Sequence, residues 1–431
     1  MNLELENMSV GDFIESSNFK LGCYFTNWAQ YRTGIGHYMP ENIDPFLCTH
    51  LIYAFAKIGT DLKIATFEWN DETLYKTFND IKLRNAELKT LLAVGAAAVP
   101  GAVFNNLVST QAKRQIFINS ATVFLRKYGF DGLDLDWEFP GREGNPPENK
   151  QLFTALITEM KAAFANEAGR SGKPRLMITV AVAAARRWID ASYEVDKISE
   201  HLDFMSVMCY DFAGGWNTFT AHHSPLFVGS KDRWDFLYYN AYETVTYYLN
   251  KGAPRDKLLV GIATYGRSFK LASTSNNQLG AATAGGAPAA PITKTTGFMA
   301  YYEICDLLEG GERRWIEDQK VPYAVKGDVW VGYDDKDSVI SKIEWVRQQK
   351  FAGAFVWTID FDDVKNHCKQ GSHPLVQTIR REFLGISADG LPEGKLNSTN
   401  LMGSVLGISF KVHILLVGLL VNKIANLMLQ R

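Results

Sequence analysis

The sequence has little that would direct the protein to nucleic acid or to a metal ion. Its 45 lysines and arginines are balanced by 47 aspartates and glutamates, so the surplus of basic residues that is typical of nucleic-acid-binding proteins is missing. Only five cysteines occur in 431 residues, and none of them forms a C-x-x-C pair. Zinc-binding and redox functions are therefore disfavoured, and we expect neither a metal nor another cofactor.

A continuous apolar run is also missing near the N-terminus. Residues 1–19 form an acidic extension that lacks the apolar core of a signal peptide. The tail over residues 386–431 differs, because its segment 401–421 contains only Lys411 and His413 as potential charges. This segment is long enough to cross a bilayer, although the lysine makes the span marginal. A membrane anchor, an amphipathic tail and an incorrect gene end all stay open as interpretations.

Aromatic residues, in contrast, are abundant. The chain has 10 Trp, 18 Tyr and 26 Phe, which is more than a core of this size needs. Surplus aromatic side chains often line grooves for flat ligands such as sugar rings. Most of these residues are nevertheless expected in the core.

Short apolar runs alternate with amphipathic helical stretches along the chain. Residues 117–128 and 153–164 carry apolar side chains at helical spacing. Eight apolar runs separated in this way predict an α/β fold, a (β/α)8 TIM barrel whose strands are buried on both faces. The predicted strands cover residues 20–28, 50–58, 88–95, 129–138, 175–184, 204–212, 257–266 and 352–360.

One connection in this pattern is too long for a simple loop. About 85 residues separate the seventh and eighth predicted strands, and they include one helical and several strand-like pieces. We therefore expect a small α+β insertion domain over about 268–338, between strand 7 and helix 7 of a barrel that spans residues 20–385. An insertion at the C-terminal ends of the strands would form the wall of a ligand groove.

Residues 130–140, FDGLDLDWEFP, place four acidic residues in an apolar stretch. Side chains alternate along a strand, so Asp134, Asp136 and Glu138 should face the barrel interior, with Glu138 at the C-terminal end. Burying carboxylates is unfavourable unless they share protons or find partners, and proton sharing would raise some of their pKa values. This arrangement indicates acid catalysis. A carboxylate metal site is the alternative, but three stacked acids without a histidine form a poor octahedral cage.

The segment DGLDLDWE resembles the D-G-x-D-x-D-x-E signature of the family 18 glycoside hydrolases, the chitinases. CYFTNWAQYR, MSVMCYDF, TYGRSF and FVWTIDFDD also resemble this family, and the likeness covers about residues 20–385. It implies that Glu138 is the general acid and that the acetamido oxygen of the substrate attacks the anomeric carbon. Asp136 would orient that acetamido group, and Asp134 would share a proton with Asp136.

The resemblance also implies a set of substrate-binding residues along a groove, with Trp357 as the aromatic floor at the cleaved sugar. The other members are Tyr24, Trp28, Tyr31, Glu68, Trp69, Ala97, Ala98, Phe139, Met208, Cys209, Tyr210, Asp211, Trp216, Tyr265 and Arg267.

The same resemblance implies two disulfides, Cys23–Cys48 and Cys305–Cys368, and leaves Cys209 free. Disulfides form in the secretory pathway, so an extracellular protein is expected although no signal peptide is visible. The expected partners are chitin or N-acetylglucosamine oligosaccharides, without nucleic acid, and the expected state is a monomer.

The sequence departs from the family at the end of the third predicted strand. Residues 95–100 are GAAAVP, where the family has Gly-Gly-Trp-Asn-Phe-Gly. Ala97 thus replaces a tryptophan that stacks on the sugar, and Phe139 replaces a tyrosine beside the general acid. Two functions follow as expectations. The first is an endo-acting chitinase with weakened binding, and the alternative is a chitinase-like lectin that binds N-acetylglucosamine oligomers with little hydrolysis.

Overall fold

The protein was analysed as a computed structural model, which describes residues 19–142 and 144–384. Within these residues, one sheet has the strand order β1-β15-β8-β7-β6-β5-β4-β2-β3. Parallel pairing of β1 with β2 closes it into an eight-stranded barrel, and β3 is an antiparallel addition to β2. The predicted TIM barrel is confirmed. Its strands are β1 (Lys20–Thr26), β2 (His50–Ile58), β4 (Lys89–Gly95), β5 (Gly132–Asp136), β6 (Met177–Val182), β7 (Phe204–Val207), β8 (Leu258–Ala263) and β15 (Gly353–Trp357), and β3 is Ile64–Ala65.

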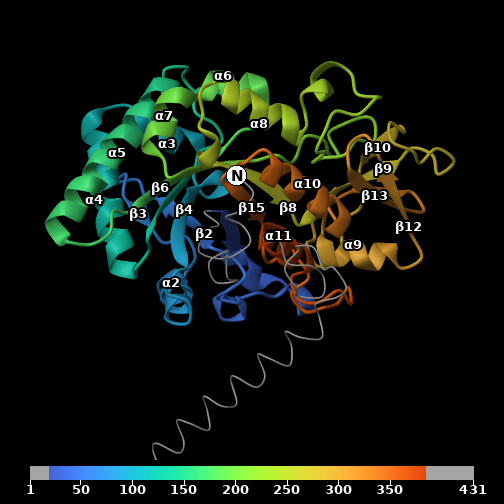
Figure 1. Ribbon diagram of the computed structural model, residues 1–431, viewed down its shortest axis with the longest axis horizontal. Coiled ribbons are helices and arrows are strands. Elements are labelled where there is room, and N and C mark those ends of the chain that lie inside the picture. Colours follow the sequence, from blue (N-terminus) through green and yellow to red (C-terminus); the bar gives the residue numbers. More distant parts are fainter. Residues whose placement is uncertain (1–18, 143, 385–431) are drawn as a thin grey trace, which may run out of the picture. The chain divides into compact units, whose positions relative to one another are not determined.

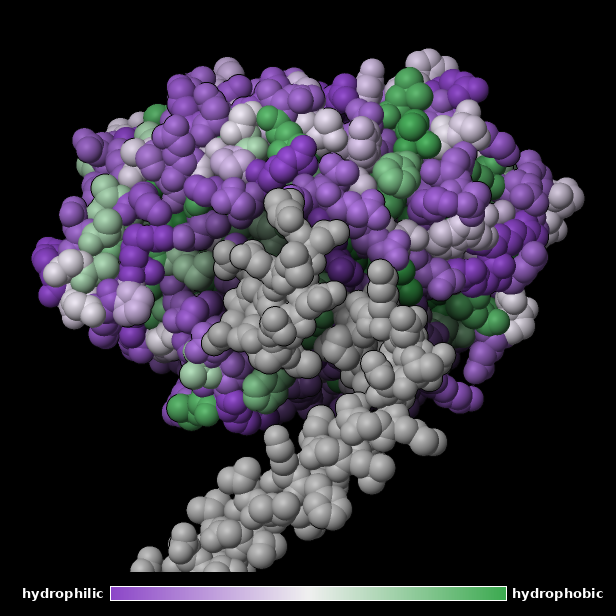
Figure 2. Space-filling model, viewed as in Figure 1, coloured by the Kyte–Doolittle hydropathy of each residue, from purple (hydrophilic) through white to green (hydrophobic). Residues whose placement is uncertain are grey.

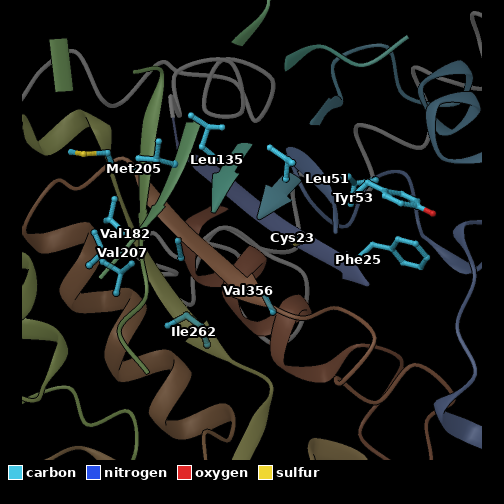
Figure 3. Close-up of a cluster of buried hydrophobic side chains, with 14 of the residues drawn as sticks. Cys23, Phe25, Leu51, Tyr53, Leu135, Val182, Met205, Val207, Ile262 and Val356 are labelled. Carbon is cyan, nitrogen blue, oxygen red and sulfur yellow. The ribbon is translucent and has the colours of Figure 1, made fainter. Parts of the chain in front are cut away.

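Alternation along the strands separates two apolar clusters. Side chains such as Phe25 on β1 and Leu135 on β5 point outward and join the large core between strands and helices, as Figure 3 shows. Their inward-facing neighbours, such as Tyr24 and Phe355, form a smaller cluster inside the barrel. Both faces of the strands are therefore buried, which explains why the strands are apolar in nearly every position.

Helices surround the barrel, and several of them cover its outer core. Helix α4 buries Phe117 and Ala121, and α5 buries Phe153 and Met160, at the spacing that the sequence predicted. Figure 1 shows α4 and α5 on the side of the barrel opposite the insertion. The helices are α2 (Asp71–Asp80), α3 (Gly101–Val108), α4 (Gln111–Tyr128), α5 (Asn149–Ser171), α6 (Arg186–Ser192), α7 (Val195–His201), α8 (Ala241–Asn250), α9 (Tyr301–Leu308), α10 (Lys336–Gln348) and α11 (Pro374–Leu384).

The predicted insertion between the seventh and eighth barrel strands is an antiparallel sheet with one helix, α9. The strand order of this sheet is β10-β9-β14-β13-β12, and β11 also pairs with β9. Strand β9 follows the barrel strand β8 almost directly in the chain. Continuity from β8 into β9 carries residues of the insertion to the C-terminal end of the barrel. The strands are β9 (Tyr265–Leu271), β10 (Thr283–Gly286), β11 (Phe298–Ala300), β12 (Glu312–Ile316), β13 (Val321–Lys326) and β14 (Val329–Gly332).

Two disulfides, Cys23–Cys48 and Cys305–Cys368, join distant parts of this unit, and the thiol of Cys209 is free and buried. The pairing implied by the sequence resemblance is confirmed. In the described part of the chain, no helix is both long and apolar enough to span a membrane, and the segment 401–421 lies outside the described residues. On the face shown in Figure 2, the described residues are mainly hydrophilic, with apolar residues in small separate groups.

Candidate active site

The lowest of the three acids, Asp134, is held by two hydroxyl groups. It lies on β5 with no exposed surface, and the register of β5 and β6 places Thr179 beside it. Tyr24 Oη donates a hydrogen bond to Asp134 Oδ2 at 2.7 Å, and Thr179 Oγ1 donates to Oδ1 at 2.5 Å. Burial raises the pKa of Asp134 to about 6, although both hydrogen bonds lower it. This side chain is therefore positioned by residues of two other strands, Tyr24 on β1 and Thr179 on the neighbouring β6.

The middle acid, Asp136, has fewer partners. It is 3% exposed, and its Oδ1 has no hydrogen-bond partner among the described residues. Burial, and then the negative charges of Glu138 and Asp134, raise its pKa well above the ordinary value. A buried carboxyl oxygen without a partner requires either a proton of its own or a donor from a ligand.

The third acid, Glu138, opens onto a cavity at the C-terminal end of the barrel. Solvent reaches its side chain through the cavity, but the surrounding protein encloses it. This enclosure raises the pKa of Glu138, the charge of Asp211 raises it further, and the Arg142 guanidinium lowers it. The arrangement favours a protonated carboxyl group that faces the cavity, as a general acid requires.

The cavity has a volume of about 690 Å³ and brings together residues from most of the barrel. Trp357, at the end of β15, forms part of its floor and is held by aromatic contacts with Tyr24, Phe55 and Trp28 at centroid distances of 5.2, 5.9 and 6.4 Å. Of the residues predicted from the sequence, the cavity lining includes Tyr24, Asp136, Glu138, Phe139, Met208, Tyr210, Asp211, Trp216, Tyr265 and Trp357.

Asp211 is fixed by the insertion. Tyr265 Oη donates to Asp211 Oδ1 at 2.7 Å, and Arg267 donates to both carboxylate oxygens at 2.7 and 2.6 Å. Burial raises the pKa of Asp211, but hydrogen bonds and charge from His223 and Arg267 outweigh it and hold the pKa below the ordinary value. Arg267 therefore shapes the cavity through Asp211 and does not itself line it.

Four predicted groove residues lie outside this cavity, on the segments that follow β1 and precede α2. Trp28 is half-buried against Phe55, whereas Trp69 is 85% exposed. Tyr31, 54% exposed, donates a hydrogen bond to Glu68 at 2.6 Å. Of these four residues, Trp28 contacts Trp357, and Tyr31 and Glu68 are joined to each other.

Cys209 does not face the groove, contrary to the prediction. Strand alternation turns Met208 and Tyr210 toward the cavity and Cys209 into the outer core, where it has no exposed surface. A side chain buried in this way cannot contact a sugar. Ala98 also lies outside the cavity lining, because it packs against both apolar clusters.

The segment GAAAVP forms a tight corner at the end of β4. Gly95 has φ of 137°, and a Cβ added there would lie 1.9 Å from the carbonyl oxygen of Asp136. Ala96 follows in the left-handed region with φ of 45°, and residues Ala96–Ala98 form a 3-10 turn. Only the methyl group of Ala96 reaches the cavity from this corner as part of its described lining. The corner holds the backbone of β4 against Asp136.

Several lining residues were missed by the sequence analysis. Arg142 comes from the loop after β5, Arg187 and Trp188 come from the start of helix α6, and Tyr239 comes from the segment before α8. The tripeptide Arg186-Arg187-Trp188 begins two residues after the end of the predicted strand 175–184, at the end where ligands bind to such barrels. This position in the sequence could have identified these residues as part of the site.

Comparison with known proteins gives the family. The model of the glycosyl hydrolases family 18 matches residues 20–362. The chain belongs to family 18 of the glycosyl hydrolases. This family 18 member is 48% identical to chitotriosidase-1 of Mus musculus over 84% of its own length and 78% of that protein. It is 44% identical to chitinase-3-like protein 2 of Homo sapiens, over 85% of its own length and 93% of the relative.

A solved structure supports the same assignment. The family 18 chain aligns with human YKL-39 with a TM-score of 0.81 and 44% identity, covering 84% of this chain and 99% of the other. YKL-39 is described as a pseudo-chitinase with retained chitooligosaccharide binding properties. The relatives of this family member therefore include both a chitotriosidase by name and a protein described as a pseudo-chitinase.

Proposed function

We propose that this protein is an endo-acting chitinase, which hydrolyses β-1,4-N-acetylglucosamine linkages in chitin and chitooligosaccharides with retention. One observation carries the proposal, namely that the complete acid series is present with Glu138 enclosed at the cavity and its pKa raised above the ordinary value. Such a group can protonate a glycosidic oxygen near neutral pH.

The remaining acids fit a mechanism in which the substrate supplies the nucleophile. The free Oδ1 of Asp136 is suited to accept the N–H of an acetamido group and so to direct the acetamido oxygen toward the anomeric carbon. Asp134 is held by Tyr24 and Thr179 beneath Asp136. Its negative charge raises the pKa of Asp136 and so favours the protonated form of Asp136. Trp357 offers an aromatic face on which the reacting sugar can lie.

The alternative is a lectin that binds N-acetylglucosamine oligomers with little hydrolysis. The corner Ala96–Ala98 favours it, because this corner has no aromatic residue where the family resemblance expects a stacking tryptophan. Loss of one stacking platform removes on the order of 1 kcal/mol of binding free energy. Binding by YKL-39, whose relationship to this chain is described above, is compatible with either function.

Turnover of a fluorogenic chitobioside decides between the two. For an enzyme, we expect Glu138→Gln to lower kcat by roughly 100-fold or more, because it removes the proton donor and keeps the shape of the side chain. Glu344→Gln, at an exposed position on α10, is the matched control and should retain activity. Equal and negligible turnover by the wild type and Glu138→Gln would eliminate the chitinase, and chitooligosaccharide binding under those conditions would establish the lectin.

We also propose that the protein is extracellular. Support comes from the two disulfides, which persist in oxidising compartments. Whether residues 401–421 add a membrane anchor remains a prediction, and so does the monomeric state. Fractionation of tagged protein between culture medium and membranes tests the anchor, and recovery only from the medium would exclude it.

A further inference from the structure

Four arginines lie in or beside the cavity, and they differ in their partners. Arg267 is paired with Asp211 at 2.6 Å, and Arg186 is paired with Glu243 at 2.5 Å. Arg142 and Arg187 both line the cavity, and neither forms a hydrogen bond or ion pair through its side chain within the described part of the chain. Two positive charges at one end of the cavity are thus left without an acidic partner from the protein.

Both unpaired arginines lie against one aromatic platform. Phe139 and Trp188 stack with ring centroids 5.5 Å apart and an interplanar angle of 28°. The Arg142 guanidinium lies 4.4 Å from the Trp188 ring centroid, and that of Arg187 lies 5.2 Å from it. Stacking on an aromatic face orients a guanidinium and leaves the N–H groups at its edge free to bind an anion.

Acidic groups near this platform do not neutralise it. Asp235 also lines the cavity, but its carboxylate accepts a hydrogen bond from Tyr239 Oη at 3.4 Å and forms no ion pair with either arginine. Glu138 feels the charge of Arg142, yet no ion pair joins them. Burial raises the pKa of Tyr239, which also lines the cavity, and the charge of Arg187 lowers it.

We propose that Phe139, Arg142, Arg187 and Trp188 form a subsite for an anionic sugar, one that carries a sulfate or carboxylate group. The sugar ring would lie on the Phe139–Trp188 platform, and the guanidinium groups would bind its anionic substituent, because planar N–H pairs match the oxygens of sulfate and carboxylate. This inference rests on the proposed saccharide specificity and narrows it, since N-acetylglucosamine oligosaccharides that carry an acidic group would bind more tightly than neutral ones.

Binding is best measured in a Glu138→Gln background, so that the probes stay intact. Three probes share one backbone: tetra-N-acetylchitotetraose, its 6-O-sulfated form and its C6-carboxylate form. At low salt, we expect at least one charged probe to bind about tenfold more tightly than the neutral parent, as charge-assisted hydrogen bonds would give. The preference should shrink at high salt, and the two charged forms distinguish sulfate from carboxylate as the preferred group.

Substitution of the arginines locates the effect. The double variant Arg142→Gln/Arg187→Gln should lose the preference and still bind the neutral parent, whereas Arg170→Gln, an exposed arginine near the end of α5, should keep it. The single variant Arg187→Gln serves if the double variant is unstable, because this side chain is exposed. If the Glu138→Gln protein with both arginines intact bound all three probes with equal affinity, the proposed subsite would be overturned. Turnover of the neutral chitobioside is a separate readout, so the subsite and the chitinase activity can fail independently.

Discussion

At the scale of single residues, the three acids of the site differ in what surrounds each carboxyl group. Asp134 receives two hydrogen bonds from hydroxyl groups, which stabilise its charged form. Asp136 has an oxygen without a partner among the described residues, and Glu138 opens onto the cavity. A shared proton is therefore better placed on Asp136 or Glu138 than on Asp134, so the proton is held where the substrate arrives.

The buried charge of Asp134 should destabilise the fold at neutral pH. Its pKa of about 6 in the folded protein exceeds the ordinary value of 3.8, so the folded state binds the proton more tightly and loses stability as pH rises through this window. Relative to Asp134→Asn, the wild type should lose about 2 kcal/mol of unfolding free energy between about pH 4 and about pH 8. Urea unfolding at both pH values checks this. Exposed Asp328→Asn is the control, and a difference that does not change with pH would contradict the prediction.

Arg142 should set the alkaline limit of activity. Burial and Asp211 raise the pKa of Glu138, and the Arg142 charge lowers it. Arg142→Gln should therefore raise this pKa and move the alkaline limb of kcat/KM to higher pH, because Glu138 would keep its proton longer. The pH profile on the fluorogenic chitobioside shows the direction. Arg187→Gln serves as the comparison, and a shift of the Arg142→Gln limb to lower pH would refute the assignment.

At the scale of secondary-structure elements, the corner after β4 controls how closely β4 approaches β5. Gly95 pairs with Asp136 in the parallel register, and the carbonyl oxygen of Asp136 leaves no room for a Cβ on Gly95. Ala96, next in the chain, has a side chain in a region of φ that favours glycine. Both of these adjacent positions therefore favour glycine, but only the first of them is a glycine.

Opposite substitutions should therefore have opposite effects. Gly95→Ala should lower the unfolding free energy by about 3 kcal/mol or more and displace Asp136, whereas Ala96→Gly should raise it by about 1 kcal/mol by relieving the positive φ. Chemical unfolding measures both. Gly169→Ala in α5, where an added Cβ meets nothing, controls for the loss of glycine itself and should be mildly stabilising. A tolerated Gly95→Ala would show that the corner can open.

The helices and strands could be predicted from the sequence where they depend on the local pattern of apolar and polar residues. Burial on both faces made the barrel strands apolar, and alternation alone placed Asp134 and Asp136 inside the barrel. The contribution of Thr179 could not be predicted, because it depends on the register between β5 and β6. The platform of Phe139 and Trp188 was missed for a similar reason, since the loop after β5 and helix α6 meet only in three dimensions.

At the scale of the whole molecule, disulfides connect parts of the unit that are far apart in sequence. Cys305–Cys368 spans 63 residues and joins α9 of the insertion to the segment before α11, whereas Cys23–Cys48 spans 25 residues at the start of the barrel. A cross-link that closes a longer loop restricts the unfolded chain more strongly. The position of the insertion over the cavity thus depends partly on a covalent bond.

Removal of the longer cross-link should weaken the fold without touching the acids. Cys305→Ala/Cys368→Ala should lower the unfolding free energy by about 4 kcal/mol, the chain-entropy value for a loop of 63 residues. Denaturant unfolding followed by tryptophan fluorescence measures the loss. The same variant should be less sensitive to added reductant than the wild type, and equal stability of the two proteins under oxidising conditions would contradict the prediction.

The burial of Cys209 in the outer core gives the protein a built-in reporter of its own opening. Its thiol has no exposed surface, and burial raises its pKa to about 12, so a thiol reagent should not label the folded protein. The other four cysteines are oxidised. In the presence of excess reagent, the labelling rate of this single thiol therefore follows the rate at which the barrel opens, which allows the kinetic stability of the unmodified chain to be measured by mass spectrometry.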